Sequence, residues 1–238
     1  MRGFFYVKES IMDANTQNKL TEYLRKFATE SRWQKIEETV RLRTRHISVV
    51  VEDIYQSHNA SAVLRSCDGF GIQDVHIIEN QNKFDASNQV TIGADQWLTQ
   101  FRYNEPNMDN TEACFKSLKA KGYKVIATSP HENDLNLNDL PVDDKMALVF
   151  GTELDGISDR AKELADGFVK IPMAGFSESF NISVSAAICL YNLTRRLRDS
   201  NVDWRLSGEE IAELKYFWLK QSIKAGEQLE KAFLEENK

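Results

Sequence analysis

The sequence predicts an α/β fold in which a mostly parallel sheet carries helices on both faces. Short β-branched or apolar segments alternate with helical periodicity through the middle of the chain, as in folds built from strand–helix–strand units. Both ends of the chain show helical periodicity instead. We therefore expect one α/β domain flanked by helical extensions.

The elements follow one another in this pattern from the N-terminus. Residues 9–44 are expected to be helical, since leucine and aromatic residues recur there at helical spacing. Residues 47–51 form a nearly continuous β-branched run, which is typical of a strand buried on both faces. A helix over about 59–70 and a strand over 75–78 complete the first repeat of the alternation.

The same alternation continues to the C-terminus. It predicts helices over 111–121, 158–165 and 181–198, and strands over 124–128, 145–150 and 168–171. Gly122 is expected to end its helix and Ser158 to cap the start of another. Residues 207–236 are expected to form a helical tail whose apolar positions suit packing on a neighbouring surface.

Composition narrows the class of protein. The chain is 42% hydrophobic and 28% charged, and it has no apolar run of the roughly 18 residues that would suggest a membrane span. Its three cysteines, Cys67, Cys114 and Cys189, have no paired spacing. This argues against a disulfide framework or a zinc site and favours a reducing cytoplasm. The four histidines are also scattered, so we expect no metal site.

The distribution of charge matters more than its sum. The net charge of −6 counts against nucleic-acid binding at first. However, residues 25–45 hold seven Lys or Arg against three Glu, and Arg195, Arg196 and Arg198 form a second basic cluster. These clusters fit either an RNA-binding surface or the solvated faces of helices.

Three segments place polar residues or glycines where a predicted strand ends, which is where ligands bind in open parallel sheets. The first holds Asn59 and Arg65 in the first two turns of a helix, from which both can reach one cleft. Asn59 could equally be an ordinary helix cap. Arg65 is unusual, because the neighbouring residues of its helix are small or apolar, and an unpaired guanidinium would be costly to bury there.

The other two segments follow later strands. Gly151 and Gly156 allow a close backbone approach to a ligand, with Glu153 between them as an acceptor. Ser179 and Asn181 then open a long apolar helix, whose first N–H groups can hold polar ligand groups. A tight turn and a capped helix are the alternative explanations. The nearby Ile171 and Met173 could flank a flat heterocycle.

One glycine pattern argues against a further class of enzyme. Asp68-Gly69-Phe70-Gly71 contains Gly-x-Gly, but it closes a helix instead of opening one. The dinucleotide-binding fingerprint needs the glycines between a strand and the start of a helix. We therefore do not expect a dinucleotide-dependent oxidoreductase.

Taken in this order, the three segments resemble the three sequence motifs of the SpoU family of SPOUT RNA 2′-O-methyltransferases. The motif residues are Asn59 and Arg65, then Gly151, Glu153 and Gly156, then Ile171-Pro172-Met173 with Ser179, Asn181 and Ser183. Three motifs in the right order are far more specific than any one of them. The chain is most similar to the branch of the family that methylates guanosine-18 in the D-loop of tRNA.

This resemblance implies an architecture, a cofactor and partners. The architecture is a SPOUT domain over 46–200 with a C-terminal trefoil knot, an RNA-binding helical extension over 1–45 and a second extension over 201–238. Such a knot would be an exception to the rarity of knotted chains. The implied cofactor is S-adenosyl-L-methionine, and the implied partners are tRNA and a second copy of the chain in a homodimer.

The resemblance also assigns roles to residues. Arg65 would act beside the ribose 2′-hydroxyl, as a base or as a stabilising charge, with Asn59, Glu153, Ser179 and Asn181 completing the catalytic site. The cofactor would contact Thr128, Gly151, Glu153, Gly156, Ile171, Met173, Ser179, Phe180 and Asn181. Arg41, Arg43, Arg45, His58, Arg195, Arg196 and Arg198 would hold RNA phosphates.

Two alternatives remain within this fold. A methyltransferase that acts on ribosomal RNA or on another tRNA position would use the same chemistry. A non-catalytic RNA-binding relative would keep the fold, but it is expected to have lost Arg65 or Asn181, and both are present.

Overall fold

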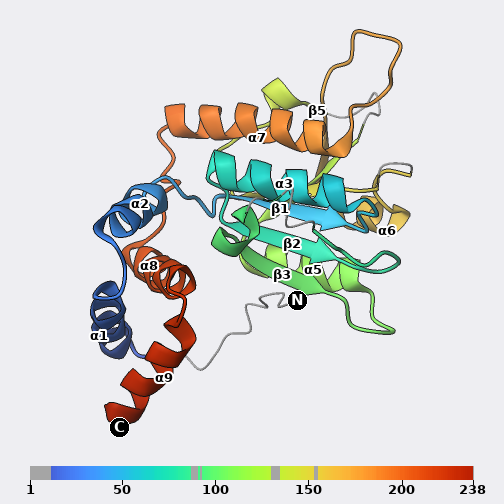
Figure 1. The fold of residues 1–238 in the computed structure, drawn as a ribbon. Coiled ribbons are helices and arrows are strands. Elements are labelled where there is room, and N and C mark those ends of the chain that lie inside the picture. Colours follow the sequence, from blue (N-terminus) through green and yellow to red (C-terminus); the bar gives the residue numbers. More distant parts are fainter. Residues whose placement is uncertain (1–11, 87–90, 92, 130–134, 153–154, 238) are drawn as a thin grey trace. The chain divides into compact units, whose positions relative to one another are not determined.

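Two compact units make up the protein, shown as a ribbon in Figure 1. The computed structural model describes residues 12–86, 91, 93–129, 135–152 and 155–237. Within this part of the chain, residues 44–204 form an α/β unit, and residues 12–43 and 205–237 form a helical unit. Helices from both ends of the chain therefore belong to one unit.

The α/β unit is built on a sheet in which every neighbouring pair of the described strands is parallel. The strands are β1 (Ile47–Glu52), β2 (Asp74–Ile78), β3 (Thr99–Tyr103), β4 (Lys124–Thr128), β5 (Leu135–Asn136), β6 (Met146–Phe150) and β7 (Gly167–Lys170). They lie in the order β3-β2-β1-β6-β4-β7-β5. Strands β1, β2 and β6 are buried along their whole length, as parallel strands covered on both faces must be. The predicted α/β class is confirmed.

Helices cover both faces of this sheet. On one face α3 (Ser57–Phe70) and α7 (Ile182–Asp199) pack side by side (Figure 1). On the other lie α5 (Asn110–Ala120) and α6 (Asp159–Leu164). Successive side chains of a strand point to opposite faces, so Val49 of β1 joins the first core and Val50 the second. Burying one such valine contributes about 1.5–3 kcal/mol.

The strand register brings several strand ends to the same edge of the sheet. Val51 of β1 pairs with Phe150 of β6, and Thr128 of β4 pairs with Val169 of β7. The residues that follow these strands therefore emerge close together at the carboxyl edge, where ligands of open parallel sheets bind. Among the described residues, no helix is long and apolar enough to cross a membrane.

The helical unit consists of four helices from the two ends of the chain. They are α1 (Ala14–Arg25), α2 (Glu30–Val40), α8 (Gly208–Ser222) and α9 (Gly226–Glu236). Helix α8 packs against α1 and α2, and Leu20, Leu24 and Trp218 are at most 1% exposed. The neighbouring surface expected for the apolar positions of the C-terminal tail is therefore the N-terminal helix pair.

Each of the two helical stretches predicted at the ends of the chain consists of two helices within the described residues. The N-terminal stretch breaks after α1, and the side chain of Thr29 caps α2 by accepting a hydrogen bond from the Arg32 N–H at 3.2 Å. The C-terminal tail breaks between α8 and α9. Helical periodicity continues through both breaks because the helices on either side turn their apolar positions to one core.

Several short elements escaped the sequence analysis. Strand β3 has a single buried residue, Thr99, and its other side chains are partly exposed, so the strand shows no continuous apolar run. Strand β5 has two residues, both exposed. The 3₁₀ turns at Ala94–Trp97 and Leu137–Asp139 are too short to show a period.

Candidate active site

A pocket of about 590 Å³ lies at the carboxyl edge of β4, β6 and β7. Its lining comprises Thr128, Ser129, Phe150, Gly151, Thr152, Asp155, Gly156, Ile157, Lys162, Val169, Ile171, Met173, Glu178, Ser179, Phe180, Asn181, Ile182, Ser185 and Cys189. Eight predicted cofactor-binding residues are in this set, and the ninth, Glu153, lies outside the described residues. The second and third sequence motifs therefore meet at one cavity, although the cofactor role of each residue stays a prediction.

The loop after β6 folds tightly back on itself. The Thr152 N–H donates to the Gly156 carbonyl oxygen at 2.7 Å, and Gly156 adopts a left-handed φ of +68°. A Cβ on Gly151 would lie 2.0 Å from the Gly156 carbonyl oxygen, far inside van der Waals contact. Position 151 therefore requires glycine, which lets backbone line the pocket directly.

The third motif lies at the start of α7. The Asn181 side chain caps this helix, since its Oδ1 accepts hydrogen bonds from the Ser183 N–H at 2.9 Å and the Ser183 hydroxyl at 2.6 Å. Its Nδ2 donates to Asn59 Oδ1 at 3.1 Å. This bond ties the first motif to the third, across 122 positions of sequence.

Asn59 and Arg65 occupy different environments on α3. Asn59 is 4% exposed and also donates from Nδ2 to Gln56 Oε1 at 3.1 Å. It lies in the first turn of α3 without being its N-cap, because that position is Gln56. Arg65 is exposed and is not among the described residues that line the pocket. The Arg65 guanidinium is therefore not buried, and the desolvation cost expected from its apolar neighbours is not incurred.

The pocket offers both apolar and polar walls. Ile157, Val169, Ile171 and Met173 supply apolar surface, and the chain around Gly151 supplies backbone, which together suit a flat heterocycle bearing hydrogen-bonding edges. Asp155, Lys162 and Glu178 bring charges of both signs. Such a lining fits a ligand with an aromatic end and a charged end.

Two observations limit the chemistry of this pocket. Burial raises the pKa of the Cys189 thiol to about 12, so this lining residue is protonated and a poor nucleophile at neutral pH. Within the described chain, no group of His, Cys, Asp or Glu residues could hold a metal ion.

Sequence reasoning missed several residues of the lining. Ser185 and Cys189 lie one and two turns into α7 after Asn181, on the same side of the helix. Helical spacing from Asn181 could have identified both. Ser129 directly follows β4, so the rule that ligands gather at strand ends could have identified it as well.

The predicted RNA-binding residues of the first basic cluster differ in environment. Arg41 is exposed. Arg43 is 1% exposed, and its guanidinium lies 5.1 Å from the centre of the Trp218 ring. Arg45 is mostly buried and pairs with Asp74 at 3.1 Å. The position of Arg43 does not present it to a phosphate, so we remove Arg43 from the RNA-binding set.

The remaining candidates lie on α3 and α7. His58 and Arg195 are exposed. Arg196 donates to the carbonyl oxygens of Leu137 at 3.0 Å and Leu140 at 2.6 Å, which fixes its side chain against the loop before β6. Arg198 is exposed, although one of its nitrogens donates to the Phe70 carbonyl oxygen at 2.9 Å. On this geometry His58, Arg195 and Arg198 are better placed for phosphate contacts than Arg196.

The chain is similar to known RNA methyltransferases. A tRNA (guanosine(18)-2′-O)-methyltransferase of Borreliella burgdorferi is 41% identical over 84% of this chain and 90% of its own length. The enzyme of that name from Thermus thermophilus is 34% identical over 81% of this chain and 98% of its own. The crystal structure of A. aeolicus TrmH/SpoU tRNA modifying enzyme superposes with a TM-score of 0.72 at 26% identity, covering 82% of this chain and 98% of that one.

The family model points the same way. The model described as the SpoU rRNA Methylase family matches residues 46–191, which span the sheet, the pocket and the start of α7. The three motifs, the parallel sheet and these similarities agree, and the chain belongs to the SpoU methylase family.

Proposed function

We propose that the protein transfers a methyl group from S-adenosyl-L-methionine to a ribose 2′-hydroxyl of tRNA, at guanosine-18 of the D-loop. The observation that carries the proposal is the Asn181–Asn59 hydrogen bond, which joins the first and third motifs beside a pocket lined by the second. The relatives named for this reaction align over more than four fifths of the chain.

The pocket residues fit this cofactor. Its adenine would lie between Ile171, Met173 and the backbone around Gly151, where N–H and carbonyl groups can read the edges of the base. Charged groups of both signs, such as Lys162 and Asp155, suit the carboxylate and ammonium of the methionine part. When bound, S-adenosyl-L-methionine supplies an electrophilic methyl group.

The residues of this chain then have to orient the ribose and handle a proton. A ribose hydroxyl is a weak nucleophile at neutral pH, so alignment and removal of its proton both lower the barrier. Arg65 is assigned to the 2′-hydroxyl, as the base or as the charge that stabilises the developing alkoxide. An arginine stays protonated in ordinary surroundings, which favours the electrostatic role. Asn59 and Glu153 would orient Arg65 or the ribose, and Ser179 and Asn181 would complete the site.

The wider architecture and location belong to the same proposal. A C-terminal trefoil knot is supported by the chain path, because β7 lies between β4 and β5 while α7 packs on α3. A homodimer is supported by exposed apolar side chains on α7, such as Val184 and Tyr191, which a second copy would cover. The three free cysteines suit a reducing cytoplasm.

RNA contacts are proposed at the helical segment before residue 46 and at residues of α3 and α7. The SPOUT domain is proposed to span residues 46–200, followed by a second helical extension over 201–238. Arg41, Arg45, His58, Arg195 and Arg198 are the proposed phosphate contacts. Ribosomal RNA is the alternative substrate, because the description of the matching family model names rRNA methylases.

Arg41 and Arg43 provide a matched pair for testing the RNA-binding set. Arg41→Ala is expected to weaken tRNA binding. It should also reduce the slope of log K against log salt concentration by about 1, the value for one lost phosphate contact. Arg43→Ala is expected to leave that salt dependence unchanged. Instead it lowers the free energy of unfolding by about 2 kcal/mol, because it removes a buried cation–π contact with Trp218. Titrations at several salt concentrations and thermal unfolding separate the two effects.

The reaction is tested with purified protein, labelled S-adenosyl-L-methionine and unmodified tRNA transcripts, followed by mapping of the methylated nucleotide. A 2′-O-methyl group at guanosine-18 supports the whole proposal. Transfer to another tRNA position, or to ribosomal RNA alone, keeps the reaction and replaces the substrate. Cofactor binding without transfer to any RNA would mean that the proposed acceptor is wrong.

A further inference from the structure

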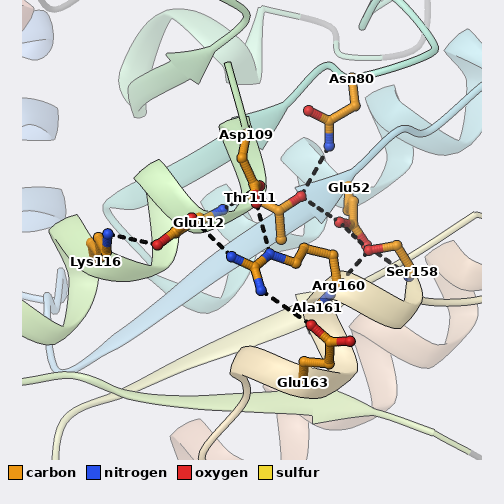
Figure 2. Close-up of polar contacts among 10 residues, drawn as sticks. All are labelled: Glu52, Asn80, Asp109, Thr111, Glu112, Lys116, Ser158, Arg160, Ala161 and Glu163. Carbon is orange, nitrogen blue, oxygen red and sulfur yellow. Dashed lines mark hydrogen bonds and ion pairs between the residues drawn. The ribbon is translucent and has the colours of Figure 1, made fainter. Parts of the chain in front are cut away.

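A buried carboxylate lies at the end of β1, outside the pocket. Glu52 is 2% exposed and, within the described residues, no lysine or arginine pairs with it. Its Oε1 accepts hydrogen bonds from the Thr111 hydroxyl and the Ser158 hydroxyl, both at 2.8 Å, and its Oε2 accepts one from the Ser158 N–H at 3.0 Å. Figure 2 shows the carboxylate between these two residues. Burying a carboxylate costs free energy unless hydrogen-bond donors compensate for the lost water. Thr111 and Ser158 supply these donors to Glu52.

Ser158 connects this carboxylate to the pocket. It directly follows Ile157, which lines the pocket together with Gly156 and Asp155. It is also the N-cap of α6, because its hydroxyl oxygen accepts a hydrogen bond from the Ala161 N–H at 3.0 Å. Both its backbone and its side chain are bound by Glu52, so the end of the pocket loop is fixed to the end of β1.

The start of the same loop is fixed by the pairing of β6 with β1. Gly151 follows β6, whose last residue Phe150 pairs with Val51 of β1. Strand β1 therefore holds the pocket loop at both ends, at the start through the sheet register and at the end through Glu52. The close approach between Gly151 and Gly156 depends on both ends keeping their separation.

Other contacts hold the helices around Glu52 without reaching the loop. The Thr111 hydroxyl oxygen accepts a hydrogen bond from Asn80 Nδ2 at 2.9 Å. Arg160 of α6 bonds Asp109 at 2.7 Å and Glu112 at 2.8 Å (Figure 2). The pKa of the Asp109 carboxyl is held below its usual value, first by the Glu112 N–H and then by Arg160. These contacts join α6 to the start of α5, whereas the Glu52–Ser158 contact sets the position of the loop.

We propose that Glu52 is a positioning residue for cofactor binding, which acts through Ser158 to hold the pocket residues Asp155, Gly156 and Ile157 in place for the cofactor. The inference rests on the proposed function, because it takes the ligand of this pocket to be S-adenosyl-L-methionine. Glu52 itself does not contact the ligand. Its removal should therefore change affinity for the cofactor more than it changes the reaction of the bound cofactor.

The test compares Glu52→Ala, Glu52→Gln and Thr111→Val with the wild-type protein. The dissociation constant of S-adenosylhomocysteine is measured by calorimetry, kcat at saturating S-adenosyl-L-methionine by transfer to tRNA, and Tm by thermal unfolding. We expect Glu52→Ala to raise the dissociation constant about tenfold, because it removes both hydrogen bonds by which the charged carboxylate holds Ser158. We expect kcat to change less than the dissociation constant, because Asn59, Arg65 and Asn181 lie outside the pocket loop.

Glu52→Gln and Thr111→Val separate positioning from general support. A glutamine oxygen can still accept from the Ser158 N–H and its amide can donate to the hydroxyl oxygens, so this variant should keep most of the affinity. Thr111→Val removes a bond to Glu52 that does not reach the loop, and it should lower Tm without raising the dissociation constant. Ser158→Ala weakens the same link from the loop side, and it takes the place of Glu52→Ala if that variant does not fold.

The outcomes are distinct. An unchanged dissociation constant in Glu52→Ala, or an equal rise in Thr111→Val at a similar loss of Tm, overturns the role of Glu52 alone. A wild-type protein that binds neither S-adenosylhomocysteine nor S-adenosyl-L-methionine overturns the proposed function and this inference together. A selective rise in Glu52→Ala, with Glu52→Gln near wild type, supports the positioning role.

Discussion

Arg65→Ala is expected to lower methyl transfer to tRNA by about 100-fold or more, the usual contribution of a positioned group that handles a proton or a developing charge. Affinity for S-adenosylhomocysteine should stay within about twofold of wild type, because Arg65 is not among the described residues that line the pocket. The exposed position of Arg65 also means that its loss removes no core packing, so Tm should not change. Single-turnover transfer and calorimetry on the same preparation check both parts.

Arg65→Lys is the matched control for the chemical role. It keeps a positive charge near the ribose but loses the planar fork of the guanidinium. Partial activity in this variant would support an electrostatic role, whereas activity as low as in Arg65→Ala would require the specific geometry of arginine. If Arg65→Ala loses cofactor affinity and keeps its turnover at saturation, Arg65 acts in binding and the catalytic assignment is wrong.

The central strands of the sheet and the position of the pocket could be predicted from the sequence, for one physical reason. Parallel strands buried on both faces leave a strong local signal, as at Ile47–Glu52 and Met146–Phe150. Because such strands end at a common edge, the polar residues that follow each strand can be assigned to one cleft from their positions in the sequence. The structure places Gly151, Met173 and Asn181 around that cleft.

The contacts between distant residues could not be predicted in this way. The burial of Arg43 depends on Trp218 of α8, at the other end of the chain, and local charge gives the opposite expectation of an exposed phosphate ligand. Glu52 similarly looks like the polar end of a strand, and only its contact with Ser158 reveals a link to the pocket loop. Strand β3 was missed because its side chains are only partly buried, so they show no clear period.

Gly151→Ala is expected to weaken cofactor binding by about 100-fold, which is near the upper end of the 1–3 kcal/mol that overpacking typically costs. The added Cβ would lie 2.0 Å from the Gly156 carbonyl oxygen and 2.4 Å from the Ile157 nitrogen. Both atoms belong to the backbone, so a side-chain rotation cannot relieve the clash. The loop has to open, and the 2.7 Å hydrogen bond from the Thr152 N–H to the Gly156 carbonyl oxygen is lost with it.

Gly175→Ala is the matched control, since the same methyl group at that position meets nothing within 4 Å. Its dissociation constant for S-adenosylhomocysteine should stay within about twofold of wild type, because neither strain nor a clash is introduced. Calorimetric titration of both variants shows whether cofactor binding needs the close contact between Gly151 and Gly156. Wild-type affinity in Gly151→Ala would show that the loop opens when the cofactor binds. A loss of affinity in Gly151→Ala alone means that the close contact of Gly151 with Gly156 is needed for cofactor binding. Backbone atoms would then form this wall of the pocket, where side chains form the others.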